Sequence, residues 1–242
     1  MINDAAKTNN PFRLLLWTAT ISSFAGAVTT FLLFTIPAPE APDFESQVRL
    51  FQNSLYVTKL WILFIHPQLN FLACLGVVVL LWERHAPLMI ISLLFMFVWM
   101  YTEVSQQAFI IDALNQFWRP EYLQATENTA KNTLATLIKG ASAYSDSQYF
   151  IVIYAFGIGS IVMGMAMIQE IGLIRWIGIA QLFIGILSLA SFIRYYLGWS
   201  NIGMVVNWCY EYIYFYIQPL TRILIGIWIF RVILKKQTEA LS

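Results

Sequence analysis

Long apolar stretches alternate with short polar ones along almost the whole chain. Residues 14–36 contain no charged side chain, and further apolar stretches cover residues 56–82, 88–113, 149–168, 173–197 and 205–234. About 20 apolar residues are enough for a helix to cross the hydrocarbon core of a bilayer. The pattern therefore predicts an all-α protein, a polytopic membrane helical bundle with six transmembrane helices in a single integral-membrane domain covering residues 1–242.

The first connection contains signals for a short additional helix. Three prolines between residues 37 and 42 end the first span, because proline lacks the backbone donor that a helix interior needs. Asp43 is then expected to cap a new helix, and apolar residues recur at helical spacing over residues 44–55. We expect an amphipathic helix at the membrane surface that continues into the second span, which is kinked near Pro67. Residues 83–87 form a predicted tight turn.

The longest polar connection covers residues 114–147. Its apolar residues also recur at helical spacing, with Pro120 near the first helical turn and Gly140 at the expected end. This is the second predicted amphipathic segment, and both segments fall on the same side of the bundle. They are expected to be interfacial helices, and a lid over the bundle is the alternative.

The composition supports a lipid environment. The chain is 59% hydrophobic and only 11% charged, so it has too few charged residues to cover a water-facing globule of its size. The net charge of +1 gives no basic field for nucleic acid. Cys74 and Cys209 fall at different expected depths, as do His66 and His85, so the sequence predicts no disulfide, no metal site and no cofactor.

The distribution of cations between the spans predicts the orientation. Short loops with Lys or Arg face the cytoplasm in most membrane proteins. The short connections place both termini there, with these cations on the cytoplasmic side: Lys7, Arg13, Arg84, Arg175, Arg231, Lys235 and Lys236. The opposite side holds Arg49, Lys59, Arg119, Lys131 and Lys139.

Polar residues inside the predicted spans are the main functional signal. A carboxylate about halfway along a membrane helix costs several kcal/mol unless it is paired or neutralised, so Glu103 marks a site. A rise of about 1.5 Å per residue places polar residues of several spans at similar heights in the outer half of the bilayer. The candidate ligand-binding residues are Glu103, Arg222, Arg194, His66, Gln106, Gln107, Gln218, Glu211 and Asn70.

Helical spacing groups these residues into faces. Residues 207, 211, 214, 218 and 222 share one face of the last predicted span, and Lys59, His66 and Asn70 share one face of the second. Polar faces in a membrane turn toward each other or toward water. We therefore expect a polar cavity in the outer half, ringed by Trp99, Trp199, Trp208, Tyr210, Tyr212 and Tyr216. The alternative for residues 208–216 is an aromatic belt at the membrane interface.

The charges of this layer leave two interpretations open. Glu103 and the more peripheral Glu211 can pair with Arg194 and Arg222, in which case the layer holds helices together and binds nothing. If the arginines are not paired, a surplus guanidinium favours an anionic ligand such as a lipid phosphate or a carboxylate. The sequence contains no zinc-protease motif, no serine-hydrolase motif, no P-loop and no lysine placed for a retinal Schiff base.

Two glycine-rich segments resemble a known family. They are Phe156-Gly157-Ile158-Gly159-Ser160 through Met163-Gly164, and Arg175-Trp176-Ile177-Gly178-Ile179. They are similar to a group of bacterial six-span membrane proteins classed as the domain of unknown function number forty-three eighty-six, mainly over residues 150–190. The resemblance implies a bacterial inner (plasma) membrane protein with six helices, and it assigns no catalytic or binding residue.

Three functions follow from the sequence, in order of preference. The first is binding or transport of a small amphiphilic or anionic ligand, such as a lipid, in the polar cavity. The second is a non-catalytic subunit or assembly factor of a membrane complex or homo-oligomer, with the small residues of the fourth span at the partner interface. The third is a membrane enzyme in which Glu103 transfers protons on a lipid-soluble substrate. An enzyme is the least favoured of the three.

Overall fold

The computed structural model describes residues 10–241, and these residues form helices and connections without a β-strand. Five of the helical segments are long and apolar enough to cross a membrane. They cover residues 12–35, 54–124, 128–167, 173–196 and 200–235. The prediction of an all-α architecture built on long apolar helices is confirmed. Lys7, which contributes to the predicted orientation, lies outside the described residues.

The elements follow one another along the chain in a simple order. They are α1 (Asn10–Thr35), α2 (Phe44–Arg49), the 3-10 turn η2 (Leu50–Gln52), α3 (Ser54–Phe109), the π-helix η3 (Ile110–Trp118), α4 (Arg119–Gln124), α5 (Asn128–Met167), α6 (Leu173–Tyr196), the 3-10 turn η4 (Ser200–Ile202), α7 (Gly203–Cys209), the π-helix η5 (Tyr210–Tyr214) and α8 (Phe215–Leu241).

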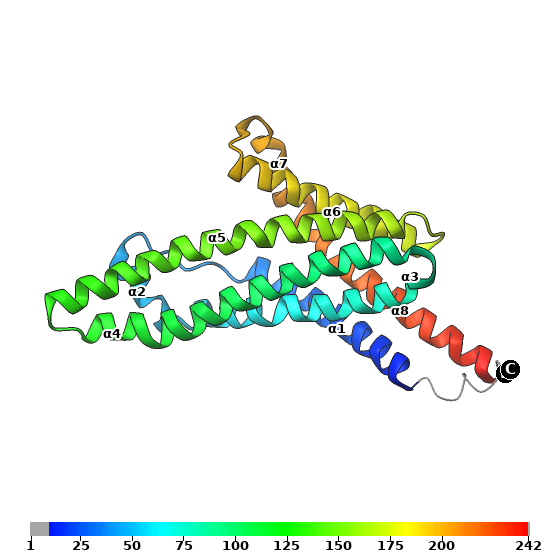
Figure 1. Cartoon of the computed structure of the whole chain (residues 1–242), viewed down its shortest axis with the longest axis horizontal. Helices are drawn as coiled ribbons and strands as arrows, with labels where there is room; N and C mark the ends of the chain where they lie inside the picture. The colour runs from blue at the N-terminus through cyan, green and yellow to red at the C-terminus, as the bar shows by residue number, and fades with distance from the viewer. Residues whose placement is uncertain (1–9, 242) are drawn as a thin grey trace.

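The 56-residue helix α3 reverses direction at His85. The backbone angles of His85 (φ −134°, ψ 29°) are the only non-helical ones inside this helix, and Figure 1 shows the chain folding back there. We call residues 54–84 the first leg and residues 86–109 the second leg of α3. The predicted turn at residues 83–87 is therefore present. The backbone stays helical through Pro67, where a kink was predicted.

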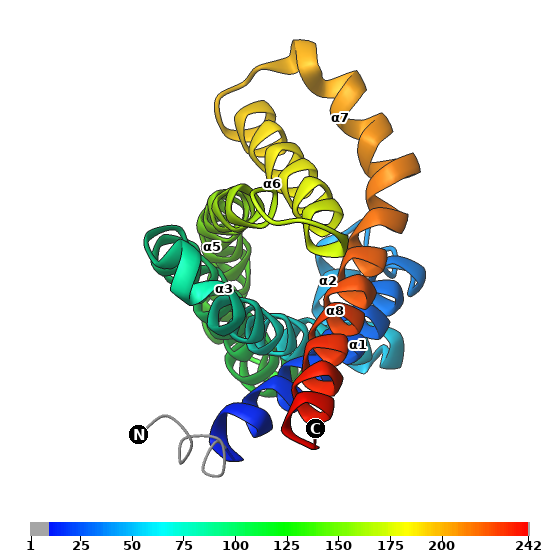
Figure 2. The same ribbon diagram turned by 90° about the vertical axis from the view of Figure 1, so that its right-hand side faces the viewer.

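The long helices form a closed ring when the molecule is viewed along its length. Figure 2 shows α3, α5, α6, α8 and α1 in this order around the ring, and each packs on its neighbours. The two legs of α3 pack on different neighbours in the ring. The first leg contacts α1, where the position of Gly76 faces Ala19, and the second leg contacts α5, where Ser92 Oγ donates to Gly159 O at 2.9 Å. Polar residues that turn inward on these helices therefore meet one another.

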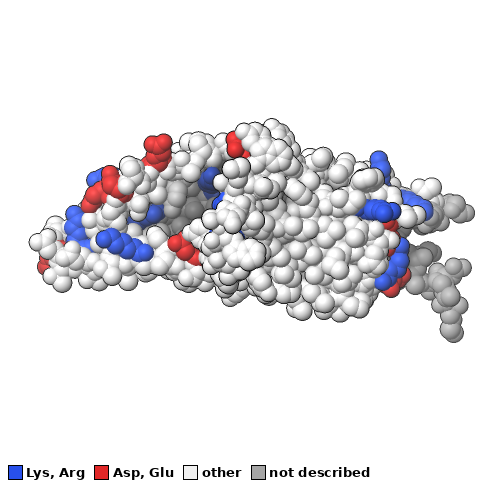
Figure 3. Space-filling view, turned by 90° about the horizontal axis from the view of Figure 1, so that it is seen from above, with Lys and Arg blue, Asp and Glu red and all other residues white. Residues whose placement is uncertain are grey.

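Two polar levels bound the apolar section of the ring. At the α4 end, Lys59 Nζ donates to Ile36 O at 3.1 Å, and Gln106 Nε2 donates to Ser145 O at 2.8 Å. From Gln106 back to the His85 turn, the second leg rises about 30 Å, which equals the thickness of a bilayer's hydrocarbon core. Figure 3 shows the charged side chains gathered at the two ends, with a largely uncharged middle section between them.

At the His85 end, one glutamate joins two turns. Glu170, in the turn between α5 and α6, accepts a hydrogen bond from Arg84 and lies 2.9 Å from His85 Nε2. Its side chain is buried, so the guanidinium of Arg84 and the ring nitrogen of His85 compensate a carboxylate that has lost most of its water. This cluster holds the turn of α3 against the turn between α5 and α6.

The amphipathic segment predicted within residues 114–147 is helical, but its predicted end is wrong. The second leg continues as η3 and α4, and α5 begins at Asn128, so only residues 125–127 interrupt the helices. Gly140, the predicted helix end, lies inside α5. Tertiary packing outweighs the low helix propensity of glycine here, because the neighbours Ile138 and Ala141 are buried. The N-terminal part of α5, residues 128–144, extends about 25 Å past the apolar section.

This extension has a hydrophobic core of its own. The core consists of the buried residues Val48, Leu114, Tyr122, Ile138 and Ala141. They come from α2, η3, α4 and α5, so the two predicted amphipathic segments pack on each other. Figure 1 shows α2 lying against the hairpin of α4 and α5 at one end of the molecule.

The predicted cap of the short helix α2 is confirmed. The backbone N–H of Ser46 donates to Asp43 Oδ1 at 2.7 Å, and this hydrogen bond holds the pKa of Asp43 below its ordinary value. The prediction that this helix continues into the second span is wrong. Asn53 leaves the helical conformation and its side chain caps α3 by accepting from Tyr56 N at 3.0 Å.

Glycines bring α5 and α6 into close contact. A Cβ atom added at Gly164 would lie 2.9 Å from Gly178 O, and one at Gly185 would lie 2.8 Å from Gly157 O. Small residues allow this approach, which gives van der Waals contact along the whole interface. The predicted packing role of the fourth span is confirmed. The hypothesis that its small residues meet a partner protein is wrong for these glycines, because α6 covers them.

We predict opposite effects of alanine at two glycines of α5. Gly164→Ala should lower the free energy of unfolding by about 1–3 kcal/mol, because the new methyl group overlaps α6. Gly140→Ala should raise it by about 0.5–1 kcal/mol, since no atom lies within 4 Å of that Cβ and alanine favours the helix. Thermal unfolding of the detergent-solubilised proteins measures both. Equal stability of the two variants would contradict the close packing of α5 on α6.

We also predict that Val48 holds α2 on the hairpin. Val48→Ala should weaken the second core by about 1–3 kcal/mol, because the Val48 side chain is fully buried. The expected result is faster cleavage of residues 36–43 by added protease, which attacks transiently opened segments. Val205→Ala, at an exposed valine, is the matched control and should leave the cleavage rate unchanged.

Candidate functional site

A chain of polar side chains crosses the interior of the bundle. Arg222 of α8 donates from Nη1 to Asn70 Oδ1 of α3. Asn70 Nδ2 lies 2.9 Å from His66 Nε2 and donates to His66 O at 2.8 Å. On its other side, His66 Nδ1 lies 2.8 Å from Thr29 Oγ1 of α1. Three helices that are far apart in sequence therefore meet through one hydrogen-bonded chain.

Residue spacing within α3 and small residues of α1 allow these hydrogen bonds to form. His66 and Asn70 are four residues apart, so they lie on one face of the first leg of α3. Gly26 of α1 leaves room for the amide, since a Cβ there would lie 2.7 Å from Asn70 Oδ1. Ser23 Oγ, one turn earlier in α1, donates to the backbone carbonyl of Arg222 at 2.6 Å. These contacts fix α8 against α1 at the height of the guanidinium.

A small cavity lies beside Arg222. The volume open to the centre of a water molecule is about 20 Å³, enough for roughly one water molecule. Its polar lining consists of Ser23, Asn70, Gln181, Gln218, Thr221 and Arg222. Its apolar lining includes Met96, Trp99, Phe156 and Met163. The cavity thus has one charged and amide-rich side and one apolar side.

Glu103 lies near this network without joining it directly. The carboxylate interacts with the side chain of Trp99 and, electrostatically, with Arg222. The ion pairs of Glu170 with Arg84 and His85 lie at the other end of the bundle. Neither Glu103 nor Glu211 forms an ion pair with Arg194 or Arg222, so the pairs that would only hold the helices together are not formed. Arg222 is held by an amide and keeps its positive charge uncompensated at contact distance.

Tyrosines of two further elements complete the polar layer. Tyr149 of α5 and Tyr214 of η5 both interact electrostatically with Glu103, and Tyr214 also interacts with Arg222. The height of Thr29 along the first span already places it in the predicted polar layer. Tyr149 and Gly26 were not predicted as site residues, because their part in the site depends on packing between helices.

Arg194 and Glu211 do not reach this site. Arg194 Nη1 donates to Asn207 Oδ1 and, at 3.5 Å, to Gly203 O, so it ties α6 to α7. Glu211 is exposed and interacts with the neighbouring Tyr212. The predicted common face of residues 207–222 is interrupted by η5, because a π-helix has more residues per turn and rotates the following positions. Gln218 and Arg222 consequently face the interior, whereas Asn207 and Glu211 do not.

The two glutamines after Glu103 have different environments. Gln106 is fully engaged, since Nε2 donates to both the carbonyl and the hydroxyl oxygen of Ser145, at 2.8 and 2.6 Å. It therefore joins α3 to α5 at the boundary of the apolar section. Gln107 is also buried, but its Oε1 has no hydrogen-bond partner.

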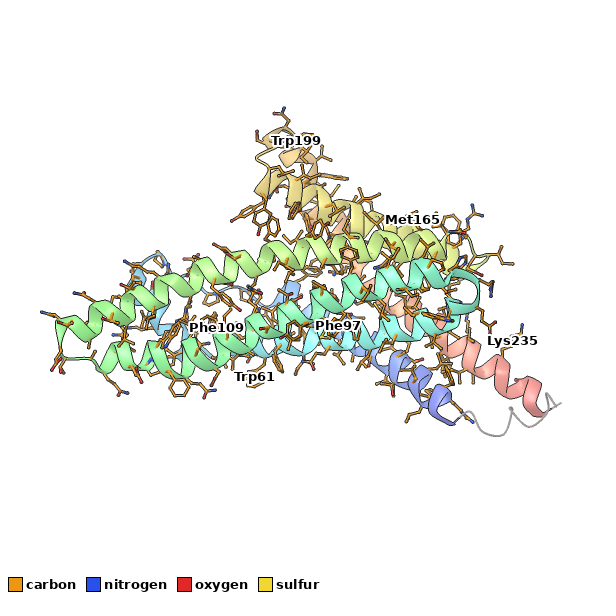
Figure 4. All side chains as sticks on the ribbon, viewed as in Figure 1. Trp61, Phe97, Phe109, Met165, Trp199 and Lys235 are labelled. Carbon is orange, nitrogen blue, oxygen red and sulfur yellow. The ribbon has the colours of Figure 1, made fainter. Side chains whose placement is uncertain are left out.

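The predicted aromatic ring around the cavity is mostly wrong. Trp99 lines the cavity, but Trp199, Trp208, Tyr212 and Tyr216 are exposed on the segment that runs from the end of α6 through α7 and η5 to the start of α8. Figure 4 shows Trp199 where this segment projects sideways from the bundle, far from Lys235 near the C-terminal end of α8. Exposed Trp and Tyr side chains near the end of a membrane-spanning helix are typical of a membrane interface. The aromatic belt is thus the better interpretation of residues 208–216.

The arrangement offers recognition rather than metal chemistry. No group of three or more His, Cys, Asp or Glu residues that could hold a metal ion occurs in residues 10–241. The site offers a guanidinium, two glutamine amides and an imidazole that is hydrogen-bonded on both ring nitrogens. These groups bind and orient an acceptor-rich ligand.

We predict that Asn70 holds the site together. Asn70→Leu keeps the size of the side chain but leaves Arg222 and His66 without their shared partner, which should cost about 2–4 kcal/mol of folding free energy. Gln68→Leu is the control, because Gln68 bonds only to Phe64 O of its own helix. Chemical or thermal unfolding in detergent compares them. Equal loss in both variants would contradict the structural role of the Asn70 amide.

Comparisons with known proteins leave the family open. No protein-family model matches the chain, and no curated protein or solved structure is significantly similar to it. The resemblance to the bacterial six-span group consequently stays a prediction.

Proposed function

We propose that the protein is a six-span bacterial inner-membrane protein that binds a small amphiphilic or anionic ligand at Arg222, either to carry it across the membrane or to hold it there. The six spans are α1, the two legs of α3, α5 within the apolar section, α6, and the segment from α7 through α8. The reversal at His85 supports counting the legs of α3 separately, because each leg exceeds the length needed to cross the hydrocarbon core.

The distribution of charge supports the proposed orientation. Arg84 lies in the short turn at the His85 end, and Arg175 follows the short turn after α5. Cations in short loops favour the cytoplasmic side, so the His85 end and both chain termini are proposed to be cytoplasmic. The hairpin of α4 and α5, with its own core, then projects from the opposite face.

The uncompensated charge of Arg222 carries the functional proposal. An arginine inside a membrane bundle is costly and is retained where it pairs with a partner or binds a ligand. Here its Nε is buried and has no hydrogen-bond partner, and no carboxylate lies within ion-pair distance. Asn70, fixed by His66, orients the guanidinium beside the cavity. An anionic group in the cavity would compensate the charge of the guanidinium.

We expect Arg222→Gln to lose a ligand that the wild type retains. Native mass spectrometry after gentle extraction should show a bound lipid or small molecule on the wild-type protein and not on this variant. Arg194→Gln is the matched control: it removes a second arginine of the apolar section, one that ties α6 to α7 and lies outside the site. The control should keep the ligand.

Ligand retention in Arg222→Gln would overturn the proposal, because it would place the binding site elsewhere. Ligand loss in Arg194→Gln as well would contradict a specific role of Arg222. A second polypeptide on the wild-type protein, with no small molecule, would favour the assembly-factor function instead.

A further inference from the structure

We infer that the anionic group taken at Arg222 is small and singly charged, as in a carboxylate or a halide. This inference rests on the proposed function and narrows its ligand class. It excludes the phosphate group of a phospholipid as the group that contacts Arg222. Two kinds of molecule can supply such an anionic group: a lipid-soluble acid with a carboxylate head, and a free monovalent anion.

The cavity is too small for a phosphate group. Its volume of about 20 Å³ accommodates roughly one water molecule, whereas a phosphate has four oxygens around a central atom. The polar side of the cavity is also held in place. Ser23 and Thr221 donate their hydroxyl protons to backbone carbonyls, of Arg222 at 2.6 Å and of Ile217 at 2.6 Å, and Asn70 is fixed by His66. A larger head group would have to break these hydrogen bonds.

The charge of the cavity lining balances a single negative charge. Arg222 is the one cation among the residues that line the cavity, so one negative charge balances it and a second would remain uncompensated between apolar helices. The carboxylate of Glu103, which already interacts with Arg222 at longer range, adds to the cost of a doubly charged ligand. The site therefore favours a monoanion over a dianion.

The donors that remain available also suit a small anion. The hydroxyl protons of Ser23 and Thr221 are engaged, and Asn70 Oδ1 accepts from Arg222. Arg222 and Gln218 both line the cavity, and the buried Gln218 makes no hydrogen bond within residues 10–241. One guanidinium and one amide suit an anion with one or two acceptor atoms.

The opposite wall suits an apolar substituent. Met96, Trp99 and Met163 line that side, and methionine side chains adapt readily to different shapes. An acid with an alkyl chain can place its carboxylate at Arg222 and displace these side chains with its tail. A free halide or formate needs less rearrangement of this wall than such an acid, because neither has a tail.

The test is a series of anions on the delipidated full-length protein in detergent at constant ionic strength, with gluconate as the reference anion. Thermal unfolding and calorimetric titration are followed for chloride, formate, octanoate, sulfate and inorganic phosphate. We expect binding of formate, chloride or octanoate, and none of sulfate or phosphate. Arg222→Gln should weaken that binding by about tenfold or more, whereas Arg194→Gln should leave it unchanged.

A second variant tests the size of the cavity with Arg222 in place. Ala73 lines the cavity, and Ala73→Val adds two methyl groups to a space of about 20 Å³. Loss of chloride and formate binding in a variant that still unfolds cooperatively supports the inference. Binding of octanoate alone identifies the source as a lipid-soluble acid, and binding of chloride and formate alone identifies a free anion.

These measurements separate ligand binding at Arg222 from the size and charge of the bound group. If a phospholipid is retained by the wild type and lost in Arg222→Gln, while no monovalent anion binds, the size inference is overturned and the proposed function stands. If the anions bind equally to the wild type and to Arg222→Gln, both are overturned. Sulfate or phosphate binding at Arg222 with an affinity equal to that of formate would also overturn the size inference.

Discussion

The guanidinium of Arg222 has to be satisfied between apolar helices, and this requirement governs how α1, α3 and α8 meet. A charged group at this depth is tolerated only with partners, and the partner supplied here is a neutral amide. Asn70 can serve in this way because His66 fixes its other side and Gly26 leaves space for it. The result is an oriented cation whose charge is not cancelled by a contacting carboxylate.

A neutral partner has different consequences from an acidic one. A buried Arg–Glu pair would be electrically complete and would have little affinity for a further anion. The Asn70 amide orients Arg222 equally well and leaves its charge available to the cavity. Glu103 stands farther away and moderates the field without quenching it. Recognition of an anion is therefore the function that we propose for this geometry, with the small cavity as the restriction on the anion's size.

Glycine packing provides the rigid frame around this site. The close approach of α5 to α6 through Gly157, Gly164, Gly178 and Gly185 leaves these helices little freedom to slide. At the His85 end, Glu170 holds two turns together, and at the α4 end the second core joins α2 to the hairpin. The polar network lies between these fixed ends, so the position of Arg222 is set by the whole ring rather than by one helix.

The sequence by itself determined the helical architecture, the long apolar helices, the turn at residues 83–87 and the cap at Asp43, because hydrophobic periodicity and capping are local properties. It also identified His66, Asn70, Gln218 and Arg222, since polar residues in apolar stretches stand out without any structure. Tertiary structure alone decided that Arg194 and Glu211 lie outside the site. Arg194 bonds to Gly203 and Asn207 of α7, and the π-helix η5 rotates Glu211 away from the face that carries Gln218 and Arg222. Packing likewise decided that α5 continues through Gly140 and that Gly26 contacts Asn70, since spacing along one helix carries no information about contacts between helices.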